Sequence, residues 1–474
     1  MATVLLAGVP KSPNLGDGLI ARTLTHIIHM HGSHKVIHFD ITQGEVEEGI
    51  AERAAQPSLP RINDAGLKKR ATPDSLRMMK AYWIHRKKDA TVGEPLKELV
   101  AQSDAVFLGG GHLLIDTYLT FPLAVKRVAD EARRQRKPLH IVLVGARGPW
   151  SSPARHWFRR ACKYATTITL RDEESRKFLL DKDPSLAGKT FALSDPALFT
   201  RETFEAALSG VREAAAAADR EFGSVPAYGA SGRGKGSRRS AASSSAAASP
   251  AAASAGRRAS ALFDANAVDA DAGGRVSAYR SNPGGIRVVA SATAERRIVG
   301  LGIMDPNELK RASEHRWERE TCADWWRDAA ATLLAQDCEV RVFTNGAATD
   351  NGFVEEYVKP RCEGLPHVSF YPYPSTVDAL YRQIAECDAV IAQRLHACLP
   401  SAAMLKPTYA IVWDKKLSDI FTDLGLADKL VDFRIPAAQA VAAMKLTADP
   451  NQAFIHTMQR KKKEIYEQIG RMLP

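Results

Sequence analysis

Short runs of apolar residues recur along this chain, and most of them end in a loop that carries glycine or arginine and leads into a helical segment. Examples are residues 4–9, 105–108, 139–144 and 389–392. Short apolar runs bounded by turn residues are typical of strands that are buried on both faces of a parallel sheet. Because these strands alternate with helices, the pattern predicts an α/β fold built on doubly wound parallel sheets.

The length and composition are those of a folded protein with room for two domains. The chain has 474 residues, of which 45% are hydrophobic, and no apolar run is long enough to predict a transmembrane helix. Residues 1–13 have no basic region ahead of their apolar run, so we expect a first strand rather than a signal peptide. The six cysteines are scattered without a C-x-x-C pair, which argues against zinc or iron–sulfur sites and favours a reducing cytosol.

One tract breaks the alternation of strands and helices. Residues 208–295 are dominated by alanine, serine, arginine and glycine, a composition that cannot bury enough apolar surface to order itself. We therefore predict a disordered low-complexity insertion between an N-terminal domain, residues 1–207, and a C-terminal domain, residues 296–474. Part of the net charge of +11 lies in this tract. We do not expect nucleic-acid binding by its arginines to be the main function.

A cation and an imidazole follow the apolar run at residues 389–392. Arg394 and His396 lie where this predicted strand turns into a predicted helix over residues 397–405. Ligands of parallel α/β sheets bind at the carboxyl ends of the strands, and helix N-termini favour anions. The motif therefore predicts contact with a phosphate or a carboxylate. The alternative interpretation is a buried salt bridge, with a histidine that only caps the helix.

The loop after the first predicted strand contains Asn14, Gly16 and Asp17, ahead of a helix predicted over residues 19–31. Glycine, asparagine and aspartate favour tight turns and positive φ. The dinucleotide fingerprint G-x-G-x-x-G is absent. Asp17 is interpreted either as a functional carboxylate or as a residue that only caps the helix.

Glycines and arginines also end the next strands of the N-terminal half. Gly110 and Gly111 follow the strand at residues 105–108 and would let a ligand approach backbone amides that can bind an anion. The alternative is a plain flexible turn. Arg147 and Arg171 follow later strands, and for both the alternative is a surface ion pair.

Other clusters of polar residues are interpreted more simply. The histidines between His26 and His34 have no cysteine nearby and only one close acid, Asp40, so we expect surface and helix-face histidines rather than a metal site. No residue cluster implies a metal. The basic clusters at residues 68–70 and 86–88 are interpreted as solvated helix faces.

Several of these motifs occur in one order, each at the end of a predicted strand. They are Asn14-Leu15-Gly16-Asp17, Gly109-Gly110-Gly111, Gly145-x-Arg147-Gly148-Pro149, Arg171-Asp172-Glu173-Glu174-Ser175, Asp195-Pro196, and Arg394-Leu395-His396-Ala397 with Lys415 behind it. This series resembles the polysaccharide pyruvyl transferase family over nearly all of the chain outside residues 208–295 and much of 44–100. The sequence departs from the family's pattern in that tract and at Gln393, where a small residue is more usual.

The resemblance implies a fold similar to that of the two-domain glycosyltransferases of GT-B type, with two facing Rossmann-like domains. It implies an enzyme of polysaccharide biosynthesis, for example of an exopolysaccharide. Such an enzyme transfers a pyruvyl group from phosphoenolpyruvate to a sugar as a ketal, and no separate cofactor is expected. The acceptor is expected to be a saccharide or its lipid-linked precursor. A cytoplasmic enzyme that associates peripherally with the inner face of the membrane is therefore expected.

The donor's charges indicate which residues would bind it. Phosphoenolpyruvate carries a phosphate and a carboxylate, and arginine binds either group through two parallel hydrogen bonds. The resemblance makes Arg147, Arg171 and Arg394 candidates for that role, and Lys415 could meet the donor's negative charge.

The chemistry of ketal formation assigns two further roles. A proton must reach the methylene carbon of the donor, and histidine can donate one near neutral pH. We expect His396 to be this acid, or to contact the phosphate, and Asp17 to be the base for the sugar hydroxyl. The other residues expected to line the substrate cleft are Asn14, Gly16, Gly110 and Gly111.

Two other functions remain open from the sequence. A glycosyltransferase that uses a nucleotide sugar would need an acidic residue in the C-terminal half to bind ribose, and after His396 none occurs before Asp414. A non-catalytic binding protein would use the basic residues of 208–295 to recruit an anionic partner. Deletion of that tract distinguishes the binding protein, which would lose its function, from the pyruvyl transferase.

Overall fold

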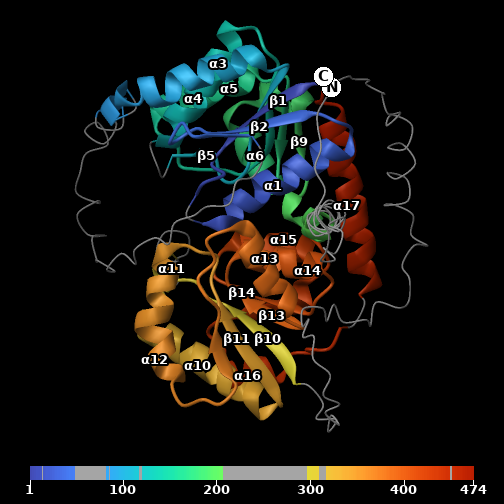
Figure 1. The fold of residues 1–474 in the computed structure, drawn as a ribbon. Helices are drawn as coiled ribbons and strands as arrows, with labels where there is room; N and C mark the ends of the chain where they lie inside the picture. Colours follow the sequence, from blue (N-terminus) through green and yellow to red (C-terminus); the bar gives the residue numbers. More distant parts are fainter. Residues whose placement is uncertain are drawn as a thin grey trace, which may run out of the picture.

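The computed structural model describes residues 1–12, 14–48, 79, 82–84, 86–116, 120–205, 296–308, 316–448 and 451–474. The predicted insertion at 208–295 and the basic cluster at 68–70 lie outside the described residues. The chain forms two α/β domains that face each other, and a long C-terminal helix runs along one side of both (Figure 1).

The N-terminal domain is built on a seven-stranded sheet in the order β3-β2-β1-β4-β6-β8-β9. All neighbours are parallel except β3, which is antiparallel to β2. The strands are β1 (Thr3–Gly8), β2 (Lys35–Asp40), β3 (Val46–Glu48), β4 (Ala105–Gly109), β6 (Leu139–Val144), β8 (Thr167–Leu170) and β9 (Thr190–Ala192). Two short strands, β5 (Leu114–Ile115) and β7 (Ala146–Arg147), pair separately beside its carboxyl edge.

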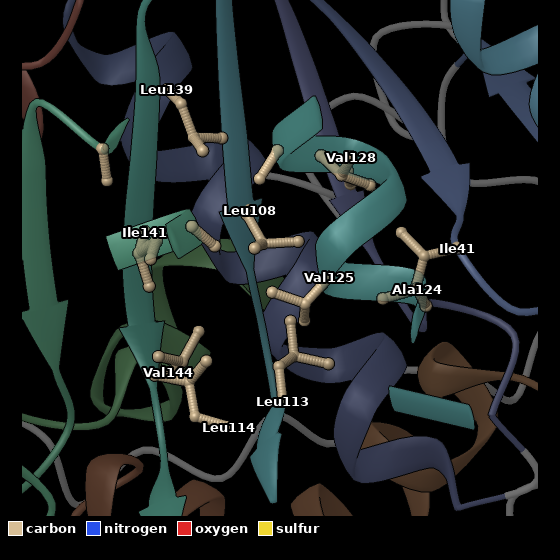
Figure 2. Close-up of a cluster of buried hydrophobic side chains, with 14 of the residues drawn as sticks. Ile41, Leu108, Leu113, Leu114, Ala124, Val125, Val128, Leu139, Ile141 and Val144 are labelled. Carbon is tan, nitrogen blue, oxygen red and sulfur yellow. The ribbon is translucent and has the colours of Figure 1, made fainter. Parts of the chain in front are cut away.

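Helices cover this sheet and complete its core. They are α1 (Leu15–Met30), the π-helix η1 (Asp89–Gly93), α3 (Glu94–Gln102), α4 (Thr120–Arg134), α5 (Ser152–Tyr164), α6 (Glu173–Lys182) and the 3-10 helices η2 (Pro184–Lys189) and η3 (Pro196–Phe199). Val125 and Val128 of α4 pack against Leu108 of β4 and Ile141 of β6 (Figure 2). These strands are buried on both faces, as their continuous apolar runs predict.

The C-terminal domain has a six-stranded, fully parallel sheet in the order β12-β11-β10-β13-β14-β15. The strands are β10 (Arg297–Gly302), β11 (Cys338–Phe343), β12 (Val368–Phe370), β13 (Ala389–Ala392), β14 (Thr408–Val412) and β15 (Leu430–Asp432). This is a doubly wound order, in which the chain reverses direction across the sheet between β10 and β13. Ligands of such sheets bind outside the carboxyl ends of the two strands at that point.

Helices also flank this second sheet. They are η4 (Pro306–Glu308), α10 (Arg319–Ala335), α11 (Ala348–Phe353), η5 (Val354–Val358), α12 (Lys359–Cys362), α13 (Val377–Glu386), α14 (Leu395–Ala403), α15 (Lys415–Asp423), η6 (Ala427–Lys429), α16 (Ala437–Ala442) and α17 (Gln452–Gly470). Trp317, Trp325 and Trp326 are buried in the same core as strand residues of β10 and β11.

Several predicted boundaries are confirmed and two local predictions are wrong. The strands at 139–144 and 389–392 have the predicted bounds. The interpretation of Asp17 as the cap of the first helix is wrong, because Asn14 is the N-cap and its Oδ1 accepts from the amide of Gly16 at 3.2 Å. The apolar run at residues 408–413 also predicts a loop beginning at Lys415, but α15 begins there because the Asp414 carboxylate caps it.

The C-terminal helix α17 joins the two domains. Phe454 and Met458, near its start, lie in a core cluster with residues of α13 and α14. Ile465 and Ile469, near its end, are buried in the core beneath α1. Among the described residues, no helix has both the length and the apolar character needed to cross a membrane.

Candidate active site

The carboxyl edge of the N-terminal sheet is shaped by a bulge in β6. The register between β6 and β8 shifts between Ile141 and Val144, and Leu143 has a φ of 51°. The hydroxyl of Thr169 accepts from the Leu143 amide at 2.9 Å, so the Leu143 amide keeps a hydrogen-bond partner within the bulge. Beyond the bulge, the amide of Gly145 donates to the carbonyl of Gly111 at 3.0 Å. The bulge thus brings the loop after β6 against the loop after β4.

The loop after β4 needs glycine at two successive positions. Gly110 and Gly111 have φ values of 87° and 73°, a region that other residues rarely adopt. A Cβ on Gly111 would lie 2.7 Å from Oδ1 of Asp17, so the glycine also makes room for that carboxylate. Burial raises the pKa of the Asp17 carboxyl, and the nearby His396 opposes that rise.

The two domains meet at the start of α1. The amide of Leu15 donates to the carbonyl of Asn345, in the loop after β11, at 3.0 Å. A Cβ on Gly16 would lie 2.4 Å from Nδ1 of His396, so only the bare backbone of glycine fits against the imidazole ring. Asp17 from one domain and His396 from the other are therefore held next to each other.

Asp195 connects the imidazole to a buried arginine. It lies just after β9, and its Oδ2 is 3.4 Å from Nε2 of His396 and 3.4 Å from Nη1 of Arg171. Its Oδ1 accepts from the amide of Ala197 at 3.0 Å, which fixes the carboxylate. Burial alone would raise the pKa of Asp195, but the adjacent His396 and Arg171 hold it below the usual range.

A second imidazole separates two cations. Nη2 of Arg171 lies 2.5 Å from Nδ1 and 2.9 Å from Nε2 of His112, and Nζ of Lys416 lies 3.2 Å from the same Nε2. Burial and the charge of Arg171 hold the pKa of His112 well below the usual imidazole value. Burial and the nearby Arg171 also lower the pKa of Lys416 to about 7. His112 is thus a neutral acceptor, beside a lysine that changes charge near neutral pH.

Arg394 is fixed by a buried carboxylate. Its Nε and Nη2 donate to the two oxygens of Asp350 at 2.7 and 2.8 Å. Asp350 is fully buried and also accepts from the amide of Asp305 at 3.0 Å. The alternative that we considered for Arg394, a buried salt bridge, therefore describes part of its environment. A guanidinium held in this way is well placed to bind an anion with its remaining donors.

A cavity of about 570 Å³ adjoins the cluster between the two domains. It is bounded by the start of α6, the connection from β9 to η3, α15 and α17. Arg171, Asp195 and Lys416 form part of its wall, and Leu198 and Ile420 contribute apolar surface. A bound molecule of moderate size could therefore reach the buried charges directly.

The predicted site residues occupy three kinds of position. Those gathered in or against the cluster are Gly16, Asp17, Gly111, Arg171, Arg394 and His396. Arg147 and Lys415 lie at the rim, where their side chains are 54% and 72% exposed and contact Asp414 and Asp419. Asn14 caps α1, and Gly110 packs against Ile20.

Four residues of the cluster were absent from the predicted site. His112 and Asp195 adjoin or belong to motifs that the sequence displays, so their positions at strand ends could have indicated them. The place of Lys416 in the site could have been predicted by recognising Asp414 as a helix cap. A helix that begins at Lys415 turns that side chain outward and the next one, Lys416, inward. Asp350 has no local signal, because it meets Arg394 only through the fold. In the described part of the chain, no three His, Cys, Asp or Glu side chains are grouped so as to hold a metal ion.

Comparison with protein families identifies the chain. The sequence model of the polysaccharide pyruvyl transferases matches residues 14–240 and 293–415, which is more than half of the chain. The chain belongs to the polysaccharide pyruvyl transferase family. It is therefore a transferase, and the family's reaction is pyruvyl transfer onto polysaccharide. The resemblance seen in the sequence motifs is confirmed, and the matched residues include Asp17, Arg171 and His396. No curated protein matches the chain.

Several solved structures are similar to this chain at low sequence identity. The UDP-GlcNAc 2-epimerase of Methanocaldococcus jannaschii has a TM-score of 0.48 and 10% identity, with 98% of this chain and 100% of that chain covered. The UDP-GlcNAc 2-epimerase of Neisseria meningitidis, bound to UDP-GlcNAc, has a TM-score of 0.43 and 8% identity, covering 99% and 100%. The glycosyltransferase SnogD of Streptomyces nogalater has a TM-score of 0.40 and 11% identity, covering 100% and 97%.

Proposed function

We propose that this enzyme transfers the pyruvyl group of phosphoenolpyruvate to two hydroxyls of one sugar in a polysaccharide or its lipid-linked precursor. The products are a pyruvate ketal and inorganic phosphate. The observation that supports the proposal is the convergence of three cations from two domains, Arg171, Lys416 and Arg394, around the buried pair Asp17 and His396.

The donor's two anionic groups suit this set of cations. Nε of Arg171 is buried and has no hydrogen-bond partner among the described residues, so a bound anion would satisfy it. We assign the phosphate to Arg171 and Lys416, which lie on either side of His112. We assign the carboxylate to Arg394, whose orientation is set by Asp350.

The proposed reaction conserves atoms and charge in two additions. His396 gives a proton to the methylene carbon of the donor, and a sugar hydroxyl oxygen bonds to the adjacent carbon. The bond from that carbon to the phosphate oxygen then breaks, and phosphate leaves with the electron pair. The second hydroxyl bonds to the same carbon and closes the ketal. Asp17 accepts a proton from an attacking hydroxyl. One of the two hydroxyl protons replaces the proton that His396 gave to the donor's carbon, and the other leaves with phosphate.

The acceptor is assigned to the cavity between α6, α15 and α17. Carboxylates line its wall in excess over cations; they are Asp172, Glu173, Glu174, Asp195, Asp419, Asp423 and Glu464. Such a wall accepts hydrogen bonds from sugar hydroxyls and disfavours a second anion. The proposal includes a lipid-linked acceptor, so the reaction would take place at the inner face of the membrane.

A thermal-shift titration tests the donor. Phosphoenolpyruvate should raise the melting temperature of the wild type, because a ligand that binds only the folded state stabilises it. The rise should be lost in Arg171→Met and kept in the matched control Arg155→Met, whose side chain is exposed on α5. Each variant is compared with its own melting temperature without ligand. Stabilisation by UDP-sugars alone would overturn the proposal in favour of a nucleotide-sugar glycosyltransferase.

A further inference from the structure

An exposed helical face in the N-terminal domain carries large apolar side chains. Residues 79, 82–84 and 86–87 are helical, and Met79, Tyr82 and Trp83 are 64%, 56% and 58% exposed. Their spacing of three and four residues places them on one side of a helix, and Arg86 and Lys87 continue the same side one turn later. Both basic residues are exposed. We call these five residues the aromatic–basic face.

This face is unusual for the surface of this protein. Seven large hydrophobic side chains are exposed in the described part of the chain, and three of them are Met79, Tyr82 and Trp83. Single exposed hydrophobics are ordinary, whereas a contiguous group bordered by charges indicates an interaction site. The sequence alone suggested only a solvated helix face at residues 86–88, because it did not show that the aromatic side chains are also exposed.

The helix continues through Lys88 into η1 beside the loop after β2. Nζ of Lys88 donates to the carbonyl of Thr42, in the loop after β2, at 2.6 Å. The backbone at Thr91 then packs against Gly44 in the same loop. Since β1 and β2 are parallel, this loop lies at the same edge as the first turn of α1, which carries Asp17. In Figure 1 the helix is the short blue segment at the left edge of the upper domain, across the molecule from α17.

We propose that the aromatic–basic face docks on the surface of an anionic lipid bilayer. Tryptophan and tyrosine favour the headgroup region of membranes, where the ring meets apolar chains and the polar atom meets water. Arginine and lysine beside them would face anionic headgroups, which is the charge complementarity that selects this partner. This inference deepens the proposed function. It rests on that function in one respect, because a lipid-linked acceptor would arrive at this same edge.

A saccharide chain is the competing occupant, and one of the two faces of the Trp83 ring is already occupied. Sugars stack on an open aromatic face, but Nζ of Lys87 lies 3.5 Å from the centroid of the Trp83 ring. That face of the indole is therefore covered by a cation. At a bilayer the same lysine can reach a headgroup phosphate while the ring stays in the interface.

Vesicle co-sedimentation of the full chain tests the proposal. The wild type should sediment with vesicles of phosphatidylglycerol and phosphatidylcholine, and much less with phosphatidylcholine alone. Binding should weaken about fivefold for each charge removed by Arg86→Gln and Lys87→Gln. The double variant Tyr82→Ala/Trp83→Ala should also weaken it. The matched control Phe191→Ala/Ile435→Ala removes exposed apolar side chains elsewhere and should bind like the wild type.

Tryptophan fluorescence locates the contact. The chain has seven tryptophans, and Trp83 is the one whose side chain is exposed. Vesicles containing phosphatidylglycerol should shift the emission to shorter wavelength, and Trp83→Phe should remove that shift while leaving sedimentation nearly unchanged. A shift that persists in Trp83→Phe would place the contact elsewhere and overturn the proposal.

The readouts separate this proposal from that of the reaction. Vesicle binding requires no donor or acceptor, so it stands if phosphoenolpyruvate fails to stabilise the enzyme. Conversely, the Tyr82→Ala/Trp83→Ala variant should keep the thermal shift with phosphoenolpyruvate. The docking proposal is overturned if the wild type does not bind the anionic vesicles, or if the variants bind as well as the wild type. If the wild type bound no vesicles but bound a polysaccharide in solution, and these variants lost that binding, the face would be a saccharide site instead.

Discussion

Nζ of Lys416 lies 3.2 Å from Nε2 of His112, although the two residues belong to different domains. Lys416 enters from the first turn of α15, and His112 from the loop after β4. Because the pKa of His112 is held well below its usual value by burial and by Arg171, the ring is neutral and can accept from the ammonium group. The cationic part of the site is therefore assembled only when the two domains are in contact.

Lys416→Met should stabilise the protein most under acidic conditions. Burial lowers the pKa of Lys416 to about 7, whereas an unfolded lysine titrates near 10.5. Between these values the unfolded chain binds more protons, so the stability of the wild type rises as pH rises. The cost of burying the charged lysine is thus largest below about pH 7. The melting temperature of Lys416→Met should exceed that of the wild type by more at about pH 6 than at about pH 9.

Lys415→Met is the control for this pH dependence. Lys415 is the neighbouring residue on the same helix, but its side chain is 72% exposed and pairs with Asp419. Exposed ion pairs contribute about 0–1 kcal/mol, so this variant should differ little from the wild type at either pH. A difference for Lys416→Met that does not vary with pH would contradict the assignment of a lysine titrating near neutrality.

Arg394→Ala should destabilise the fold as well as impair binding. The substitution leaves the fully buried carboxylate of Asp350 without its partner, which typically costs about 3–5 kcal/mol. The double variant Arg394→Gln/Asp350→Asn removes both charges and should recover much of that loss in urea unfolding. Both variants should lose the thermal shift with phosphoenolpyruvate. If Arg394→Ala were as stable as the wild type, the ion pair would not be the structural contact described here.

Gly16→Ala should disrupt the contact between the domains at the site. The added Cβ would lie 2.4 Å from Nδ1 of His396, so the imidazole or the helix start must move, at a cost of about 1–3 kcal/mol. The thermal shift with phosphoenolpyruvate should shrink accordingly. Gly188→Ala is the matched control, because a Cβ there meets nothing within 4 Å, and its stability should change by less than about 0.5 kcal/mol. Equal effects of the two substitutions would argue against the close approach at Gly16.

The strands and the ends at which ligands bind could be predicted because their signals are local. The apolar run at residues 389–392 indicates a buried strand without any knowledge of its neighbours in the fold, and Arg394 and His396 follow it directly. Within each sheet the parallel order brings such ends to one edge, and the two facing domains place the two edges together. That is why Asp17, Arg171 and His396 could be grouped before their distances were known.

The partners within the site could not be predicted because they depend on packing between distant segments. Asp350 lies 44 positions from Arg394 in sequence, and nothing near it marks a buried acid. Which of Lys415 and Lys416 enters the site depends on a single helix cap. With Asp414 at the N-cap, the helix begins at Lys415 and directs the next residue inward. Adjacent lysines have the same composition and charge, so only the helical phase separates an exposed side chain from a buried one.

The last prediction concerns the helix that spans both domains. Ile469 of α17 is fully buried in the N-terminal core, whereas Met458 of the same helix packs in a cluster that includes residues of the C-terminal helices α13 and α14. Ile469→Ala should therefore cost about 2–5 kcal/mol, by loss of apolar burial and by the cavity that remains. Lys463→Ala, on the exposed side of α17, should cost less than about 0.5 kcal/mol. Because one helix contributes to both cores, calorimetry should show that Ile469→Ala lowers a single shared unfolding transition. Two transitions, with only the N-terminal one lowered, would mean that α17 does not couple the stability of the domains.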